Sequence, residues 1–386
     1  MKRSNGQPDV VVIGAGIVGA ACAYELALQG LDVLVVDRAG VGGGVTAAGM
    51  GHLVVMDDSP AEFVLSAYSR ALWLALAPRL DVRHAFVRSG TLWVAADDEE
   101  FALAQSRQRA LQQQGIDCAT LDAQQVREAE PALRHGLCGG MIVPDDAVVY
   151  APAVAAWLLA QPVAGRIVQR LDTEVIGIER DGVRLADGGL IAAGAVLLAN
   201  GLQAATLLPS LPLQAKKGHL LITDRYPGTI RHQILELGYI KSAHNQSGTS
   251  VAFNVQPRPT GQLLIGSSRQ FDSVDPKVEP AILARMLQRA VDYLPELAGL
   301  NAIRAWTGFR PASSDGLPLI GPAGFLADDD AKHPATWLAV GHEGLGVTTA
   351  LGTAKLIASQ MLGQPAPFDA NPYLPARFTH SGTVYA

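Results

Sequence analysis

The chain has 386 residues, of which 49% are hydrophobic and 17% are charged, so it has enough apolar sequence to bury a large core in about two domains. Its formal net charge of −6 argues against a surface for nucleic acid, because affinity for phosphate needs clustered lysine and arginine. The apolar run 195–213 contains Asn200-Gly201, Pro209 and Pro212, so it predicts a buried strand and loop and no membrane span.

The cysteines point to a reducing compartment. Cys22, Cys118 and Cys138 form no CxxC pair and have no histidine at metal-ligand spacing, so we interpret them as buried thiols and expect no metal site. The basic start of the chain leads into an apolar strand without a signal-peptide cleavage site. Together these features predict a cytoplasmic protein.

The segment Asp9–Asp37 has the pattern of a dinucleotide-binding turn. Gly14 permits a tight turn after an apolar strand, Gly16 lets the backbone approach a pyrophosphate, and Gly19 lets the following helix pack close to the strand. The N–H groups that open this helix would face the phosphates. Asp37 ends the second strand, where it would accept hydrogen bonds from ribose hydroxyls and repel the 2′-phosphate of NADP.

A second glycine-rich segment covers residues 40–51, with six glycines in twelve residues. This composition predicts neither a helix nor a good strand, and it fits a backbone that passes close to a flat or anionic ligand. Hydrophobic periodicity further along the chain predicts helices separated by strand-rich blocks. The expected helices are 60–80, 98–114, 151–160, 280–293 and 347–362. Because α/β blocks alternate with strand-rich blocks, we expect two interleaved domains.

Six ordered segments carry a resemblance to one family. They are Asp9–Asp37, Val41–Gly51, Gly140–Ala147, Leu197–Gly201, Trp306–Gly321 and Gly341–Gly346. In order and content they resemble the FAD-dependent family of D-amino acid oxidase, glycine oxidase and sarcosine oxidase. Within it, the Gly341-His-Glu-Gly-Leu-Gly and Lys217-Gly-His segments look most like the catalytic (beta) subunit of D-hydroxyproline dehydrogenase and that of hydrogen cyanide synthase.

The resemblance implies an α/β fold, in which a Rossmann-like FAD-binding domain is interleaved with a smaller α+β domain built on an antiparallel sheet. We expect the FAD-binding domain to comprise residues 1–80, 145–215 and 305–375. The substrate domain would comprise 81–144 and 216–304, and residues 376–386 would form a tail.

The implied cofactor is FAD, because the second glycine loop and the C-terminal motif have no role in a nicotinamide dehydrogenase. A helix that begins near Gly346 would stabilise negative charge on the reduced flavin. The residues expected to bind FAD are Gly14, Gly16, Ile17, Val18, Gly19, Asp37, Arg38, Gly44, Thr46, Ala48, Gly49, Met50, Val175, Ala199, Asn200, Gly201, Gly308, Arg310, His342, Glu343, Gly344, Leu345 and Gly346.

Three residues are expected to act on the substrate. Arg310 would clamp its carboxylate through two parallel hydrogen bonds; the alternative is a buried ion pair with Asp315 or another acid. Tyr239, in the expected strand 238–241, would donate to the carboxylate or a hydroxyl, or it packs its ring and leaves the hydroxyl at the surface. His52 would assist deprotonation of the amine with a near-neutral pKa, or it only bonds the backbone of its loop.

The predicted reaction is the oxidation of a small amino acid, D-hydroxyproline, to a cyclic imine, with hydride transfer to flavin N5 and electrons passed to a partner subunit or carrier. The family's Gly-His-x-Arg-x-Gly pattern has an additional arginine where this chain has Gly344, which argues against simple glycine oxidation. The alternatives are an oxygen-using glycine, sarcosine or D-amino acid oxidase and the glycine-oxidising subunit of a hydrogen cyanide synthase-like complex. Two further hypotheses are an RNA-modification module and a non-catalytic subunit that relays electrons.

Overall fold

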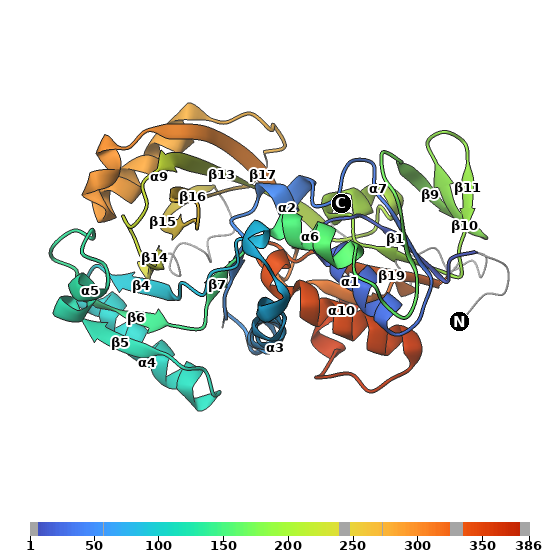
Figure 1. Cartoon of the computed structure of the whole chain (residues 1–386), viewed down its shortest axis with the longest axis horizontal. Helices are drawn as coiled ribbons and strands as arrows, with labels where there is room; N and C mark the ends of the chain where they lie inside the picture. The colour runs from blue at the N-terminus through green and yellow to red at the C-terminus, as the bar shows by residue number, and fades with distance from the viewer. Residues whose placement is uncertain (1–6, 57, 239–247, 272, 325–334, 379–386) are drawn as a thin grey trace.

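The protein is built on two large sheets that lie at opposite ends of the molecule, with the short helix α2 (Gly44–Ala48) between them (Figure 1). The structure is a computed structural model that describes residues 7–56, 58–238, 248–271, 273–324 and 335–378. The chain passes repeatedly from one sheet to the other, because strands of each come from segments far apart in the sequence. The α/β fold with an antiparallel-rich second sheet confirms the fold class predicted from the sequence.

The first sheet has six strands, five of them parallel and β18 antiparallel. In spatial order these are β18 (Leu319–Pro322), β19 (Ala335–Val340), β12 (Ala195–Leu198), β1 (Val10–Ile13), β2 (Val33–Val36) and β8 (Ile167–Arg170). The central strands are apolar along their whole length because both faces of the sheet are covered.

Helices cover one face of this sheet and a small sheet covers the other. The helices are α1 (Ile17–Leu28), α3 (Pro60–Leu76), α6 (Ala151–Leu159) and α10 (Gly346–Leu362). The small antiparallel sheet consists of β9 (Val175–Glu179), β10 (Gly182–Leu185) and β11 (Leu190–Ala192). Alternate residues of β1 therefore enter different cores: Val10 and Val12 face the helices, and Val11 and Ile13 face the small sheet.

The second sheet has eight strands, which pair antiparallel except for β14 with β4. In spatial order they are β17 (Ala302–Ser313), β13 (Leu213–Arg225), β16 (Gln262–Gln270), β15 (Thr249–Pro257), β14 (Gln233–Glu236), β4 (Thr91–Ala95), β6 (Gly139–Val143) and β5 (Ala119–Asp122). Helix α9 (Pro280–Tyr293) packs its apolar side on one face through Met286, Ala290 and Tyr293. Helices α4 (Asp98–Gln113) and α5 (Ala123–Ala129) lie at the β5 end (Figure 1).

Short elements connect the two sheets. Strands β3 (His52–Leu53) and β7 (Ala147–Val148) form a two-stranded ribbon, and α7 (Ala204–Leu207) follows β12. The 3-10 helices are η1 (Ala77–Arg79), η2 (Val82–His84), η3 (Gly201–Gln203), η4 (Pro295–Gly299), η6 (Asn371–Tyr373) and η7 (Pro375–Phe378).

The structure corrects two local expectations. The segment 40–51 was expected to lack a helix, yet α2 forms at Gly44–Ala48, because Gly43 and Gly49 sit at its two ends and leave small, helix-compatible residues between them. The long strand β17, which carries Arg310, was not among the expected elements. The expected domain boundaries at 215 and 305 fall inside β13 and β17, so the division into domains stays an expectation.

Other expectations concern absences and residues that the structure leaves undescribed. Within the described residues, no helix is both long and apolar enough to cross a bilayer, and no three His, Cys, Asp or Glu side chains gather as metal ligands. All three cysteines are free, with Cys22 and Cys118 buried and Cys138 partly exposed. Residues 239–241 of the strand expected at 238–241, including Tyr239, lie outside the described residues.

The packing of α1 against β1 predicts how a small substitution affects stability. Helix propensity alone favours Ala over Gly in a helix by up to about 1 kcal/mol. A Cβ at Gly19 would lie 2.0 Å from the Gly14 carbonyl oxygen, so we expect Gly19→Ala to lower the free energy of unfolding by about 1–3 kcal/mol. Gly40→Ala is the matched control, because no atom lies within 4 Å of a Cβ there. A stabilised Gly19→Ala protein in denaturant unfolding would contradict the packing argument.

Candidate active site

The turn between β1 and α1 forms a cradle that only glycine backbone fits. Gly14 has a φ of +109°, and a Cβ there would lie 2.6 Å from the carbonyl oxygen of Ala199. At Gly16 the nearest atom to a Cβ would be Thr46 Oγ1, at 3.1 Å. Gly14 therefore serves a tight turn and Gly19 a close helix contact, as the sequence predicts, and the approach of a pyrophosphate to Gly16 stays a prediction.

Asp37 and Thr46 complete the surroundings of this turn. The Asp37 carboxylate accepts hydrogen bonds from the N–H groups of Ala15 (2.7 Å) and Ala39 (2.8 Å), so its position is fixed by backbone on both sides. Thr46 Oγ1 accepts a hydrogen bond from the Ile17 N–H at 3.1 Å, which places α2 against the N-terminus of α1. The positive end of the α1 dipole thus lies beside the second glycine-rich segment.

Where α2 meets the eight-stranded sheet, two paired glycines leave the sheet without side chains, and we call this place the hollow. Gly218 of β13 and Gly308 of β17 are direct cross-strand partners. A Cβ at Gly308 would lie 2.7 Å from Ala48 Cβ, and a Cβ at Gly218 would lie 2.7 Å from a guanidinium nitrogen of Arg310. Next to the hollow, Trp306 Nε1 donates to the Ala48 carbonyl at 3.2 Å and fixes the end of α2. Sequence analysis missed the role of Gly218, although the Lys217-Gly-His segment was noted.

Arg310 lies across this hollow at the junction of the two sheets. Its guanidinium donates to the backbone carbonyl of Ser268 on β16 at 3.1 Å. Asp315, the alternative partner considered for it, instead receives hydrogen bonds from Arg377 at 2.6 and 3.0 Å. The Arg310 guanidinium thus lies over the sheet, next to Gly218 and the Ser268 carbonyl.

His52 lies beside Arg310. The imidazole is bonded to the backbone of Gly344, and burial together with the nearby charge of Arg310 lowers the pKa of His52 to about 4. The near-neutral pKa expected for His52 is therefore wrong, because desolvation outweighs the bond to Gly344. At neutral pH the ring carries no charge.

The loop that precedes α10 brings the C-terminal motif to the same place. His342 is buried, which lowers its pKa to about 3, and its Nε2 lies 3.0 Å from Thr353 Oγ1. Glu343 has a φ of +46° and donates its N–H to the Pro311 carbonyl at 2.8 Å. Gly344 is exposed, and a Cβ there would lie 3.7 Å from Arg310 Cδ. The N-terminus of α10, at Gly346, thus opens next to Arg310 and His52.

Charged side chains surround Glu343. Lys216 Nζ lies 3.3 Å and an Arg269 guanidinium nitrogen 3.6 Å from Glu343 Oε1, and all three side chains are at least four-fifths buried. Glu343 therefore offsets part of the positive charge that Lys216, Arg269 and Arg310 bring to this side of the sheet.

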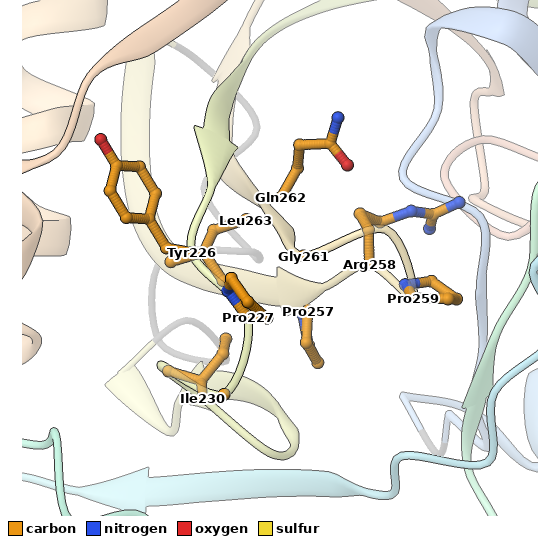
Figure 2. Close-up of a pocket in the computed structure, with 10 residues that line it drawn as sticks. Tyr226, Pro227, Ile230, Pro257, Arg258, Pro259, Gly261, Gln262 and Leu263 are labelled. Carbon is orange, nitrogen blue, oxygen red and sulfur yellow. The ribbon is translucent and has the colours of Figure 1, made fainter.

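The tip of the β15–β16 hairpin ties the sheet to the loop that carries Met50. Next to Arg258 lies a cavity of about 170 Å³ that Tyr226, Pro227 and Ile230 help to line. Figure 2 shows the Arg258 guanidinium directed away from these residues. It donates to the backbone carbonyls of Met50 (3.3 Å) and Val149 (3.5 Å), and burial lowers the pKa of Arg258.

The structure brings most of the predicted site residues into two connected regions. The first surrounds the glycine turn, where Ala199 pairs its N–H with the Ile13 carbonyl at 2.8 Å and is followed by Asn200 and Gly201. The second joins the 44–52 segment, β17 and the 341–346 loop. Arg38 is exposed beyond Asp37, and Val175 starts β9 among residues packed against the small sheet, so neither lies in the second region. Their contacts with FAD stay a prediction.

Comparison with known proteins assigns this architecture to a class. Residues 9–360 match the family model described as FAD dependent oxidoreductase, DAO, and the chain belongs to this family. The protein is therefore an FAD-dependent oxidoreductase that acts on amino acids, in agreement with the predicted cofactor and reaction class.

Individual relatives cover nearly the whole chain. The chain is 30% identical to glycine oxidase of Pseudomonas aeruginosa, over 95% of this chain and 98% of the relative. It is 28% identical to hydrogen cyanide synthase subunit HcnC of the same organism, over 96% of each. The crystal structure of glycine oxidase from Geobacillus kaustophilus superposes with a TM-score of 0.83 at 28% identity, covering 97% of this chain and 99% of that one.

The residues present fit FAD. The glycine cradle and the backbone-held Asp37 suit the pyrophosphate and ribose of its adenosine half. Gly308, which faces Ala48, and Gly266, which faces Met50, present backbone without side chains near α2, and such a surface suits a flat ring. When bound, FAD supplies the two-electron acceptor, and the protein supplies binding, orientation and exclusion of water.

The pKa of His52 predicts a pH dependence of stability. The folded protein keeps His52 neutral down to about pH 4, whereas an unfolded histidine takes up a proton near pH 6.5. Between these values the unfolded state binds more protons, so the free energy of unfolding falls as the pH falls through this window. This residue alone accounts for a loss of about 2 kcal/mol by pH 5.

We therefore expect His52→Asn to lose less stability than the unaltered protein between pH 7 and pH 5, measured by denaturant unfolding. His135, whose side chain is exposed, provides the control variant His135→Asn, which should keep the original slope. Parallel curves for the His52 variant and the unaltered protein would show that the folded state does not keep this ring neutral.

Proposed function

We propose that the protein is an FAD-dependent dehydrogenase that oxidises D-hydroxyproline to its cyclic imine and passes the electrons to a partner subunit or carrier. The observation that carries this proposal is the arrangement of Arg310 next to a neutral His52 and an unsubstituted Gly344. Each of these three features corresponds to one requirement of the reaction.

Arg310 meets the requirement for a carboxylate clamp. A guanidinium offers two parallel N–H donors, and this geometry fixes the orientation of a carboxylate as well as binding it. The Ser268 carbonyl and the hollow over Gly218 hold the guanidinium against the sheet, so little conformational freedom is lost when a substrate binds. Orientation matters because the Cα–H bond must be placed within reach of the cofactor.

Gly344 supports a substrate larger than glycine. The position where the family pattern has an additional arginine carries no side chain here, and it is an exposed glycine in contact range of Arg310. A glycine at this position takes up less of the site than an arginine side chain would, and this favours a bulkier substrate. A cyclic amino acid fits this requirement better than glycine does.

His52 supports oxidation of a neutral amine. Because the imidazole is uncharged at neutral pH, it adds no second positive charge beside Arg310 that would oppose substrate binding. A group with a pKa of about 4 is too weak a base to hold the proton of an ammonium ion at pH 7. We therefore assign His52 to shaping the site and bonding the Gly344 loop, with the substrate amine losing its proton to solvent.

The relatives support a partner for electron transfer and also a second candidate function. The relative HcnC is named as a subunit of a synthase, which fits a protein that works in a complex. The 30% identity to glycine oxidase favours an oxidase that uses oxygen with glycine, sarcosine or a D-amino acid, or a glycine-oxidising subunit. Gly344 is the feature that separates these candidates from the proposal.

The decisive experiment is anaerobic mixing of the yellow holoprotein with single amino acids, followed by absorbance near 450 nm and then by admission of air. We expect D-hydroxyproline to bleach the flavin fastest among D-hydroxyproline, D-proline, sarcosine and glycine, with slow recovery in air. Fast bleaching by glycine or sarcosine and rapid recovery in air would establish the oxidase instead.

The clamp makes a prediction about mutants. Arg310→Lys keeps the charge but loses the two parallel donors, so we expect kcat/KM for the amino acid to fall roughly 100-fold. Arg304→Lys, at an exposed position of the same strand, should stay within about twofold of the unaltered enzyme. An Arg310→Lys enzyme with unchanged kcat/KM would remove the clamp from the proposal.

A further inference from the structure

Two buried amide side chains on β15 lack partners for their oxygens. Asn254 is 6% exposed and Gln256 is 0% exposed. Among the described residues, neither Asn254 Oδ1 nor Gln256 Oε1 has a hydrogen-bond partner. A buried oxygen without a donor costs about 1–3 kcal/mol, so two of them side by side on one strand require an explanation.

Both side chains lie on the face of the sheet that meets the Met50 loop. Asn254 is paired directly with Gly266 on β16, and Gln256 is paired with Leu264. A Cβ at Gly266 would point at Leu220 Cδ2 (2.7 Å) and Met50 Sδ (3.1 Å). Because directly paired residues of antiparallel strands project to the same face, Asn254 and Gln256 share the face of this apolar contact.

A chain of hydrogen bonds fixes the orientation of Gln256. Its Nε2 donates to Gln233 Oε1 at 2.6 Å, and Gln233 Nε2 donates to Thr91 Oγ1 at 3.2 Å. The amide nitrogen of Gln256 donates to Gln233, so the other end of the same amide, its oxygen, points away from Gln233. Asn254 and Gln256 thus offer two neutral acceptors, which require neutral donors.

These acceptors lie within reach of a ligand held by Arg310. The guanidinium contacts Ser268, two residues beyond Gly266 on β16, which is about 7 Å along the strand. Asn254 is one strand further, about 5 Å across. A small amino acid with its carboxylate on Arg310 spans this separation with a hydrogen bond of about 3 Å at each end.

We propose that Asn254 and Gln256 form a subsite that accepts a hydrogen bond from a hydroxyl group on the substrate's side chain or ring. This inference rests on the proposed oxidation of an amino acid bound at Arg310, and it makes the enzyme specific for hydroxylated substrates. A hydroxyl donates one hydrogen bond, to Asn254 Oδ1 or to Gln256 Oε1, and a substrate that lacks the hydroxyl leaves that oxygen unpaired as well. Sites of this kind discriminate strongly against such analogues.

The experiment compares substrates that differ only in the hydroxyl group: D-hydroxyproline with D-proline, and D-serine with D-alanine. For the unaltered holoenzyme we expect kcat/KM to favour the hydroxylated member by about tenfold or more. Asn254→Leu, which has a similar shape and no acceptor, should remove the preference, so that the ratio of kcat/KM between the two members of a pair falls toward one. Asn254→Asp keeps an acceptor and should retain the preference, even if the leucine variant folds poorly.

A matched control comes from another buried amide far from the site. Gln360 on α10 has an amide nitrogen without a partner among the described residues, and Gln360→Leu likewise replaces an amide by an apolar side chain, so this variant should leave the preference intact. If Asn254→Leu lowers turnover of both members of a pair equally, the residue is structural and the subsite is excluded.

A binding measurement distinguishes an incorrect subsite from an incorrect proposed function. Ligand-induced shifts of Tm report binding alone when they are measured without oxygen on holoprotein whose flavin has already been reduced, because a reduced flavin cannot oxidise the ligand. A larger shift with D-hydroxyproline than with D-proline that is abolished by Asn254→Leu supports the subsite, and equal shifts or none overturn it. Flavin bleaching by D-proline as fast as by D-hydroxyproline rejects the subsite yet keeps the amino-acid dehydrogenase, whereas no bleaching by any amino acid rejects the proposed function.

Discussion

The absence of side chains at Gly218 and Gly308 is the constraint on which the junction of the two sheets depends. These residues face each other across β13 and β17, and any larger residue would collide with Arg310 on one strand or with α2 on the other. Because these two residues lack side chains, helix α2 packs directly on the backbone of Gly308, and the Arg310 guanidinium packs directly on the backbone of Gly218. The eight-stranded sheet is therefore a wall of the site as well as a scaffold for it.

Local patterns were enough to predict the nucleotide half of the molecule. Gly14 forms the turn and Gly19 packs on it five residues later, so their spacing carries this information even though the contacts of Gly14 with Ala199 and of Gly16 with Thr46 are distant in sequence. Helix α9 begins and ends where its apolar periodicity does, because one amphipathic face packs on a sheet. Helix α2 escaped prediction because its five residues are too few to show a period.

The substrate half depends on contacts between distant strands, which sequence patterns do not encode. The motif predicted Arg310 as a clamp, but the role of Gly218 and Ser268 in holding it follows only from strand register. The sequence alone does not show which face of the sheet Asn254 occupies; its pairing with Gly266 does. The pKa of His52 was misjudged because desolvation depends on packing that a loop sequence does not show.

The order of strands in the first sheet has a consequence for how the chain folds during synthesis. The glycine turn is among the first parts to be made, yet the strand that closes it, β12 with Ala199, lies about halfway along the chain, and β19 follows near the end. Pairings between such distant segments form slowly, since the intervening chain must be closed into a loop first. The nascent chain therefore carries an incomplete nucleotide site for most of its synthesis, and the apolar strands β1 and β2 need protection from aggregation until β12 arrives.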